Sequence, residues 1–287
     1  MTNEEKVILK WNSLTIKDNF IFGRTMEVNP DLCRRLIEQI LNLKIKSISY
    51  PEREKTIETR LDSKGIRIDV YVEDDANRSF DLEIQLTDND NLPKRMRYYH
   101  SLIDLDKLHK GKSVKYKSLG ESYVIFICTF DVFGCGYQVY DFETVCKRNS
   151  AIKLNDQTHR IFLCTEGDDE EISDEVRNFL NYVAGRGIKG DFIQELDEAV
   201  QKVKESKEWR LGYMTYELAL MEREELGEKR GEERGEKRGE EKGRLELVKN
   251  FLKVGTPIDY IIKATGWSKE KILEFKKSHT DSQVSGE

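Results

Sequence analysis

The sequence lacks any long hydrophobic run. None of its apolar stretches approaches the roughly 18 residues that a membrane-spanning helix requires. The first residues, MTNEEKVILKWN, contain no apolar core of the kind found in signal peptides. We therefore expect neither secretion nor membrane insertion, and we expect a cytoplasmic protein.

Cysteine is scarce and unpatterned. The chain of 287 residues has five cysteines, an odd number, and no two of them form a C-x-x-C pair. This spacing indicates neither a disulfide framework nor a structural zinc site. We expect reduced and mostly buried thiols at Cys33, Cys128, Cys135, Cys146 and Cys164.

The chain also has no overall excess of positive charge. Its net charge is −6 and its isoelectric point is about 5.6, so a surface for nucleic acid must be a local patch. Residues 92–117 contain eight Lys or Arg against two acids, a local balance of +6. A solvated helix and loop explains this balance equally well. The basic residues are Lys94, Arg95, Arg97, Lys107, Lys110, Lys112, Lys115 and Lys117.

The hydrophobic pattern predicts helices and strands in alternation. A continuous β-branched and aromatic run, SYVIFICTF at 122–130, is typical of a buried central strand. This order of elements favours a mixed α/β sheet that is covered by helices. We expect helices over 15–42 with a break near Asn29-Pro30, strands from about 44 to 87, a helix over 92–110, strands near 136–142 and 159–164, and helices near 173–184 and 191–222.

A charged repeat follows the predicted α/β part. Residues 222–244 contain seventeen charged residues, five glycines that recur every fourth position, and Leu226 as the only apolar side chain. Such a segment cannot bury a core, and we expect a marginal solvated helix or a plain linker. We therefore expect a first domain at 1–221, the charged linker at 222–244, a small helix-turn-helix-like module of three short helices at 245–277, and a disordered tail at 278–287.

The segment GIRIDVYVEDDANRSFDLEIQLT, residues 65–87, has a period of two that assigns side chains to faces. Its apolar residues share one face of a predicted hairpin, and its polar residues share the other. If the turn is centred on Ala76, Asp69 and Glu83 become cross-strand neighbours, and Gln85 lies one step further along the same face.

Two carboxylates directly opposite each other repel, and a divalent cation removes that repulsion. Oxygen-rich sites suit Mg²⁺ or Mn²⁺, which commonly bind through one or two carboxylates together with substrate phosphate. The spacing alone is also compatible with a solvent-facing hairpin whose polar face is acidic. Both interpretations stay open on these residues.

The motifs resemble a known family. Asp69, followed by Glu83-Ile84-Gln85, resembles the D…(D/E)-x-K core of PD-(D/E)XK nucleases in a variant with glutamine in place of lysine. The segments PKRMRYYHS at 93–101, LGESYVIFICTFDVFGCG at 119–136 and VYDFE at 139–143 are similar to the PD-(D/E)XK nuclease family transposases, or Rpn-type recombination-promoting nucleases. The resemblance covers about residues 10–220.

The resemblance implies a restriction-endonuclease-like mixed sheet flanked by helices. It implies that Asp69 and Glu83 bind Mg²⁺, with the carbonyl of Ile84 as an additional ligand, and that Gln85 positions the attacking water. Glutamine cannot supply the positive charge that lysine brings, so a slower reaction is expected. An acidic residue on the first core helix also belongs to this fold class; Glu38 is the candidate, with Glu27 behind it.

The same resemblance assigns the helix after the hairpin to nucleic-acid contact. Lys94, Arg95, Arg97 and Tyr98 are expected to face the backbone, because Arg forks suit phosphates. Tyr99 is expected to pack inward.

The leading hypothesis is a Mg²⁺-dependent DNA endonuclease that is linked to recombination or transposition of mobile elements. The alternative is a catalytically silent DNA-binding or self-associating protein derived from such a nuclease; Gln85 and the net negative charge keep it open. A dimer is expected from mechanism and family, because a double-strand break ordinarily needs two active sites. The C-terminal helices are open to a DNA-binding role through Lys269, Lys271, Lys276 and Lys277, and equally to docking or oligomerisation.

Overall fold

A computed structural model describes residues 1–49, 51–57, 66–87, 91–109, 115–168 and 171–280. The chain divides into two compact units, Met1–Thr215 and Tyr216–Glu287. Each unit has a hydrophobic core of its own. Gly65, Lys110 and Lys112, which the sequence singled out, lie outside the described residues.

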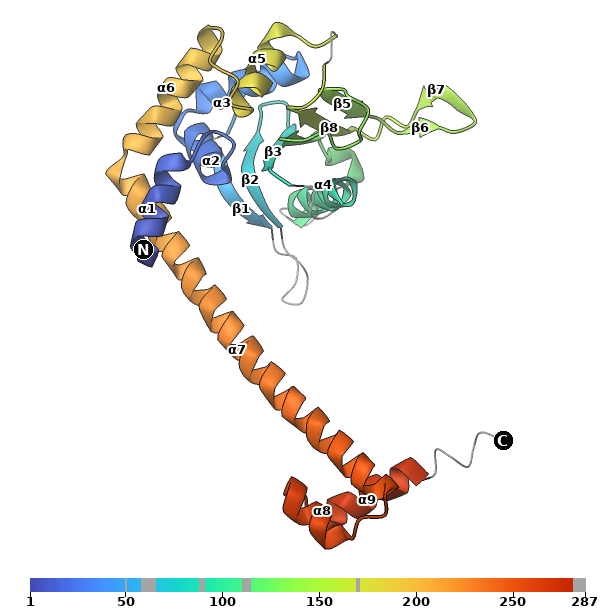
Figure 1. Cartoon of the computed structure of the whole chain (residues 1–287). Coiled ribbons are helices and arrows are strands. Elements are labelled where there is room, and N and C mark those ends of the chain that lie inside the picture. The colour runs from blue at the N-terminus through green and yellow to red at the C-terminus, as the bar shows by residue number, and fades with distance from the viewer. Residues whose placement is uncertain (50, 58–65, 88–90, 110–114, 169–170, 281–287) are drawn as a thin grey trace. The chain divides into compact units, whose positions relative to one another are not determined.

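A six-stranded mixed sheet forms the centre of the first unit (Figure 1). Its strand order is β1-β2-β3-β4-β8-β5. The first three strands pair antiparallel, β3, β4 and β8 run parallel, and β5 returns antiparallel along β8. The strands are β1 (Glu52–Ile57), β2 (Ile66–Glu73), β3 (Ser79–Gln85), β4 (Ser122–Cys128), β5 (Val139–Phe142) and β8 (Thr158–Cys164).

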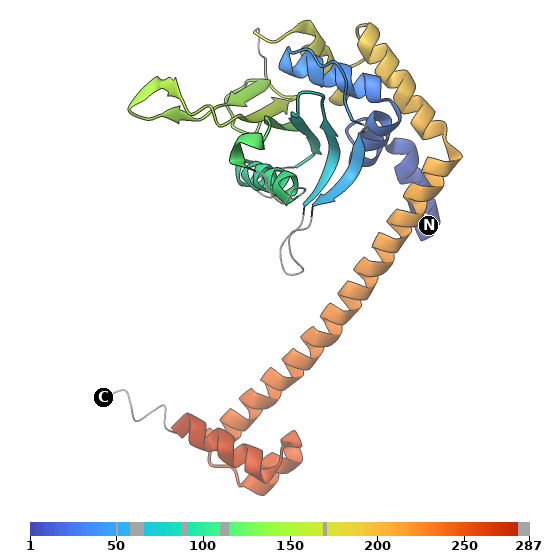
Figure 2. The same cartoon turned by 180° about the vertical axis from the view of Figure 1, so that it is seen from behind.

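Helices cover both faces of this sheet (Figures 1 and 2). On one face, α2 packs on β1, β2 and β3, and α3, α5 and α6 pack around it. On the other face, α4 (Leu92–His109) packs on β4 and β1. The predicted mixed α/β sheet flanked by helices is confirmed. The first-face helices are α1 (Asn3–Ser13), α2 (Asn19–Val28), α3 (Pro30–Leu41), α5 (Asp174–Val183) and α6 (Asp191–Glu205).

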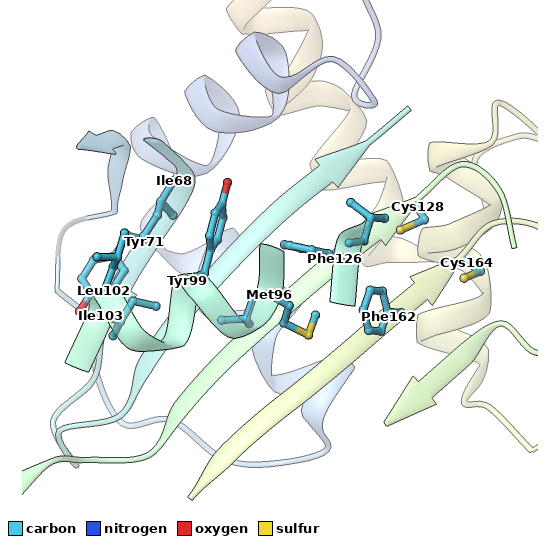
Figure 3. Close-up of a cluster of buried hydrophobic side chains, with 12 residues drawn as sticks. Ile68, Tyr71, Met96, Tyr99, Leu102, Ile103, Phe126, Cys128, Phe162 and Cys164 are labelled. Carbon is cyan, nitrogen blue, oxygen red and sulfur yellow. The ribbon is translucent and has the colours of Figure 1, made fainter. Parts of the chain in front are cut away.

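The sequence of α4 fixes how the helix lies on the sheet. It begins after Asn91, whose side chain accepts a hydrogen bond from the backbone of Lys94 at 3.3 Å, as a capping residue does. Its buried residues recur at helical spacing and form a core with β4 and β8 (Figure 3). Figure 3 shows Tyr99 between Tyr71 and Phe126. The buried stripe consists of Leu92, Met96, Tyr99, Leu102 and Ile103.

The β2–β3 hairpin has the predicted register. Tyr71 pairs with Asp81 and Val70 pairs with Leu82, which centres the turn on Ala76. The turn is held by Asp74, whose Oδ1 accepts hydrogen bonds from two backbone amides of the turn at 2.9 and 2.8 Å. A side chain that bonds its own turn in this way sets the register by local chemistry.

The hydrophobic pattern missed a helix at the start of the chain and a short hairpin. Helix α1 is short and begins with a capping box between Thr2 and Glu5, which the pattern did not single out. A hairpin of β6 (Val145–Cys146) and β7 (Asn149–Lys153) lies between β5 and β8, and its side chains are exposed, so no burial imposes a period on its sequence. The expected helix over 191–222 is two helices, with the break at Ser206.

Helix α7 (Lys207–Lys253) continues through the charged repeat, and the side chains of residues 222–244 are all exposed. The first of the three short helices expected over 245–277 is the last part of α7. It packs with α8 (Ile258–Thr265) and α9 (Lys269–Thr280), and Ser268 caps α9 as predicted. Because α9 ends at Thr280, the expected tail at 278–287 begins too early, and 281–287 lie outside the described residues. The small core of this unit consists of Val248, Ile261, Trp267 and Ile272.

The cysteines match the expectation from their spacing. All five are free thiols, and Cys33, Cys128 and Cys164 are buried. Within the described ranges, no helix combines the length and the hydropathy needed to cross a bilayer.

His100 on α4 is a buried titratable group, and we predict that it makes the fold acid-sensitive. Its Nδ1 lies 2.8 Å from the hydroxyl of Ser122, and burial, with a smaller contribution from Arg160, lowers its pKa to about 4. His100 is therefore protonated below about pH 6.5 in the unfolded chain, but only below about pH 4 in the folded chain. Stability is lost as the pH falls through this window.

The test compares wild type with His100→Asn, which can keep the bond to Ser122. We expect the urea unfolding free energy of wild type to fall by roughly 2–3 kcal/mol more than that of the variant between pH 7 and pH 4. Parallel pH curves for the two proteins would contradict the assignment.

Candidate active site

Asp69 and Glu83 lie where the backbone ladder between β2 and β3 ends. The last paired residues are Val70 and Leu82, and beyond them side chains bridge the two strands. The backbone amide of Asp69 donates to Glu83 Oε1 at 3.0 Å, and the amide of Ile84 donates to Asp69 Oδ2 at 3.4 Å. Each carboxylate therefore accepts a hydrogen bond from the opposite strand. The structure brings the two predicted acids together in a buried position.

Gln85 and Arg95 complete this group. Gln85 Nε2 donates to Glu83 Oε2 at 3.3 Å. Arg95, which reaches across from α4, donates to the same Glu83 oxygen at 2.8 Å and to Gln85 Oε1 at 2.9 Å. The Arg95 side chain is 29% exposed, and that of Glu83 is fully buried. Instead of facing outward as expected, Arg95 turns into the carboxylate group.

Asp81 is a third carboxylate of this face, to which the sequence analysis gave no role. It is completely buried on β3, and among the described residues neither of its carboxylate oxygens has a hydrogen-bond partner. Its position two residues before Glu83 places both side chains on one face of the strand. The signal was present in the sequence, because three polar residues alternate through a strand that pairs with the buried strand β4.

Burial dominates the electrostatics of this group. It raises the pKa of Glu83 well above the ordinary value, the nearby charges of Asp69 and Asp81 raise it further, and Arg95 opposes them. Burial and then Asp69 raise the pKa of Asp81 in the same way, and Arg95 again acts in the opposite direction. Although burial works to lower the pKa of Arg95, Glu83, Tyr99 and Asp69 hold it above its usual range. The guanidinium of Arg95 therefore stays charged, whereas each ionised carboxylate makes ionisation of its neighbours less favourable.

The donor set fits a hard divalent cation. Asp69, Glu83 and Asp81 offer carboxylate oxygens, and within the described residues neither oxygen of Asp81 has a hydrogen-bond partner. Within the described part of the chain, no three His, Cys, Asp or Glu side chains already stand in a metal-binding arrangement. In the conformation described, hydrogen-bond donors of the protein occupy the oxygens of Glu83.

The two candidates for the additional acid expected on a core helix, Glu38 and Glu27, lie in different places. The carboxylate of Glu38 on α3 binds Arg34 at 2.9 Å and the backbone amide of Ile45 at 2.8 Å, so it fastens the end of that helix. Glu27 lies on α2, which packs directly on β1, β2 and β3, and its carboxylate binds Arg24 at 2.5 Å. Glu27 therefore lies on a helix that packs on both strands of the site.

The other expected contacts to nucleic acid divide by their position on α4. Lys94 and Arg97 are exposed. Tyr98 is partly buried and packs against the core cluster, and Tyr99 is buried, as expected. Lys94 and Arg97 are thus available to a ligand on the outer surface of the helix.

We predict that the buried charge of Asp81 costs stability. A carboxyl group whose pKa is raised in the folded protein destabilises the fold progressively as the pH rises from about 4 toward that raised pKa. Asp81→Asn should therefore raise the unfolding free energy by roughly 1 kcal/mol or more at pH 8 in the absence of divalent metal, and by less at pH 5. Urea denaturation measures both values, with the exposed Asp168→Asn as the matched control. A variant that is less stable at both pH values would show that Asp81 has an unrecognised partner.

Comparison with known proteins agrees with this geometry. The family model described as "PD-(D/E)XK nuclease family transposase" matches residues 19–178, more than half of the chain. The matched region begins at the first residue of α2, contains the whole sheet and includes every residue of the carboxylate group. Comparisons with curated proteins and with solved structures give no match. The family supports a role in nucleic-acid cleavage or transposition. The chain belongs to the PD-(D/E)XK nuclease family transposases.

Proposed function

We propose that the protein is a divalent-metal-dependent DNA endonuclease, with Mg²⁺ as its ion and Mn²⁺ as a substitute. The observation that carries this proposal is the position of Asp69 and Glu83 just beyond the end of the β2–β3 ladder, where each carboxylate is buried and accepts a hydrogen bond from the opposite strand. Family membership adds that the chain's relatives act in DNA cleavage or transposition.

Asp69 and Glu83 would hold the metal, with the carbonyl of Ile84 as a further ligand. When bound, a divalent ion supplies positive charge beside the reacting phosphate and lowers the pKa of water. In the hydrolysis the oxygen of water bonds to phosphorus, one ester P–O bond breaks, and the departing oxygen leaves as a hydroxyl with a proton from the water. The predicted role of Gln85 in positioning that water stays a prediction.

The outer surface of α4 would bind the DNA backbone. Lys94 and Arg97 are exposed there and belong to the locally basic segment of an acidic chain. Phosphate contacts of this kind fix the position of the duplex and carry no sequence information. A homodimer with two such sites stays a prediction, as does the role of the C-terminal helices.

A specific observation favours a second candidate, a catalytically silent DNA-binding or self-associating protein. The donors of Arg95, Gln85 and the Asp69 amide already satisfy Glu83, so the site is partly neutralised without a metal. Metal binding separates the two candidates. An ion that binds the folded state alone raises its melting temperature. If neither Mg²⁺ nor Mn²⁺ shifts the melting temperature of wild type, the silent protein is favoured.

The decisive experiment is cleavage of supercoiled plasmid at low salt by wild type, Asp69→Ala and Glu83→Ala, with Mg²⁺, Mn²⁺ or EDTA. We expect metal-dependent cleavage by wild type and a loss of roughly 100-fold or more in each variant, because each substitution removes a metal ligand. Asp75→Ala, in the exposed hairpin turn, is the matched control and should cleave normally.

Far-UV circular dichroism of each variant shows whether it has kept the fold. Retained cleavage by folded Asp69→Ala would overturn the site assignment. If wild type cleaves with neither metal, the proposed endonuclease activity is wrong.

A further inference from the structure

We propose that Arg95 supplies the positive charge that lysine would bring to position 85, and that Gln85 is the positioning residue that holds the Arg95 guanidinium. This inference rests on the proposed nuclease function and deepens it. It replaces the expected outward role of Arg95 with a role inside the site.

The guanidinium of Arg95 is held on several sides. Its Nε donates to the hydroxyl of Tyr99 at 2.8 Å, and its two terminal nitrogens donate to Gln85 and Glu83. The guanidinium carbon also lies 5.1 Å from the ring centre of Tyr99 and 5.7 Å from that of Phe126. Because Tyr99 and Phe126 are buried core residues, the position of the charge is set by the packing of α4 on the sheet.

The surroundings explain why a cation is needed at this point. Asp69, Asp81 and Glu83 place three carboxyl groups on one buried face, and residue 85 contributes a neutral amide. Negative charge also grows on the phosphate oxygens during hydrolysis. A fixed guanidinium suits these oxygens because its fork geometry matches phosphate.

The orientation of the Gln85 amide supports the second half of the inference. Its oxygen accepts from Arg95 and its nitrogen donates to Glu83, so the amide connects the cation to the carboxylate. A lysine at position 85 would place a second positive charge beside the Arg95 guanidinium, and the two charges would repel each other. Gln85 and Arg95 therefore form one unit, in which the amide of Gln85 holds the guanidinium and the guanidinium supplies the charge that the amide lacks.

Neighbouring cations on α4 do not have this position. Lys94 and Arg97 flank Arg95 in the sequence, but both are exposed. Their removal should weaken DNA binding and reduce its salt dependence. Arg210→Gln, which removes one exposed guanidinium from α7, is thus the matched control for Arg95→Gln and should cleave as wild type does.

The experiment measures kcat for plasmid cleavage and the apparent Kd for Mn²⁺ from thermal shifts without DNA. We expect Arg95→Gln to lower kcat by roughly 100- to 1,000-fold, the effect of removing one fixed group that stabilises developing charge. The same variant should bind Mn²⁺ about threefold or more tightly, because Glu83 loses a competing cation. Opposite changes in kcat and Mn²⁺ affinity are not expected from a purely structural role, which would weaken both.

Rescue tests whether the two residues form a unit. The double variant Arg95→Gln with Gln85→Lys should have a kcat at least tenfold higher than that of Arg95→Gln alone. In the wild-type background, Gln85→Lys should instead lower kcat, because the lysine and Arg95 repel each other. Arg95→Lys, which keeps the charge and loses the fork, should retain about a tenth of wild-type kcat and serves as the test if Arg95→Gln does not fold.

The outcomes separate this inference from the proposed function. If wild type cleaves and folded Arg95→Gln cleaves within threefold of it, the assignment of Arg95 is wrong and the nuclease stands. Weaker Mn²⁺ binding together with no rescue by Gln85→Lys would also overturn the assignment. If wild type does not cleave with Mg²⁺ or Mn²⁺, the proposed function fails, and the inference about Arg95 fails with it.

Discussion

The structure of the first unit depends on one electrostatic constraint: several carboxyl groups are buried on one face of the sheet, and the Arg95 guanidinium reaches them from α4. Burial raises the pKa of Asp81 and Glu83, and Arg95 is the neighbour that opposes this rise for both. A folded protein tolerates such a group only where the surrounding packing compensates for it. Here the apolar stripe of α4 packs on β4 and β8, and this packing holds Arg95 within hydrogen-bond distance of Glu83.

Two pieces of topology create the group. The β2–β3 hairpin brings Asp69 beside Glu83, and the hydrogen bond from the Ala76 amide to Asp74 in its turn fixes the register of the two strands. The connection from β3 to the parallel strand β4 then requires a crossover, and α4 is that crossover. Because α4 follows β3 within a few residues, its first turns lie beside the end of β3, where Gln85 and Glu83 are. Residues from two strands and one helix thus meet at one end of the sheet.

Helix geometry also explains how one short segment places its basic residues in two different environments. Successive residues of a helix point in directions about 100° apart, so Lys94 and Arg97 can be exposed while Arg95 faces the sheet. The local excess of positive charge is therefore divided between exposed positions on the outer surface of α4 and a partly buried position beside Glu83.

Much of this was readable in the sequence, and the reason is that the decisive signals are local. The alternation in β2 and β3, the turn centred on Ala76 and the apolar run of β4 depend on neighbours a few residues apart, and they were sufficient for the register, the sheet and the family. The inward turn of Arg95, the isolation of Asp81 and the commitment of Glu38 to the end of α3 depend on contacts between distant segments. Spacing along the chain says which residues share a face, but only the packing of α4 and α3 decides which face is buried and which charge meets which partner.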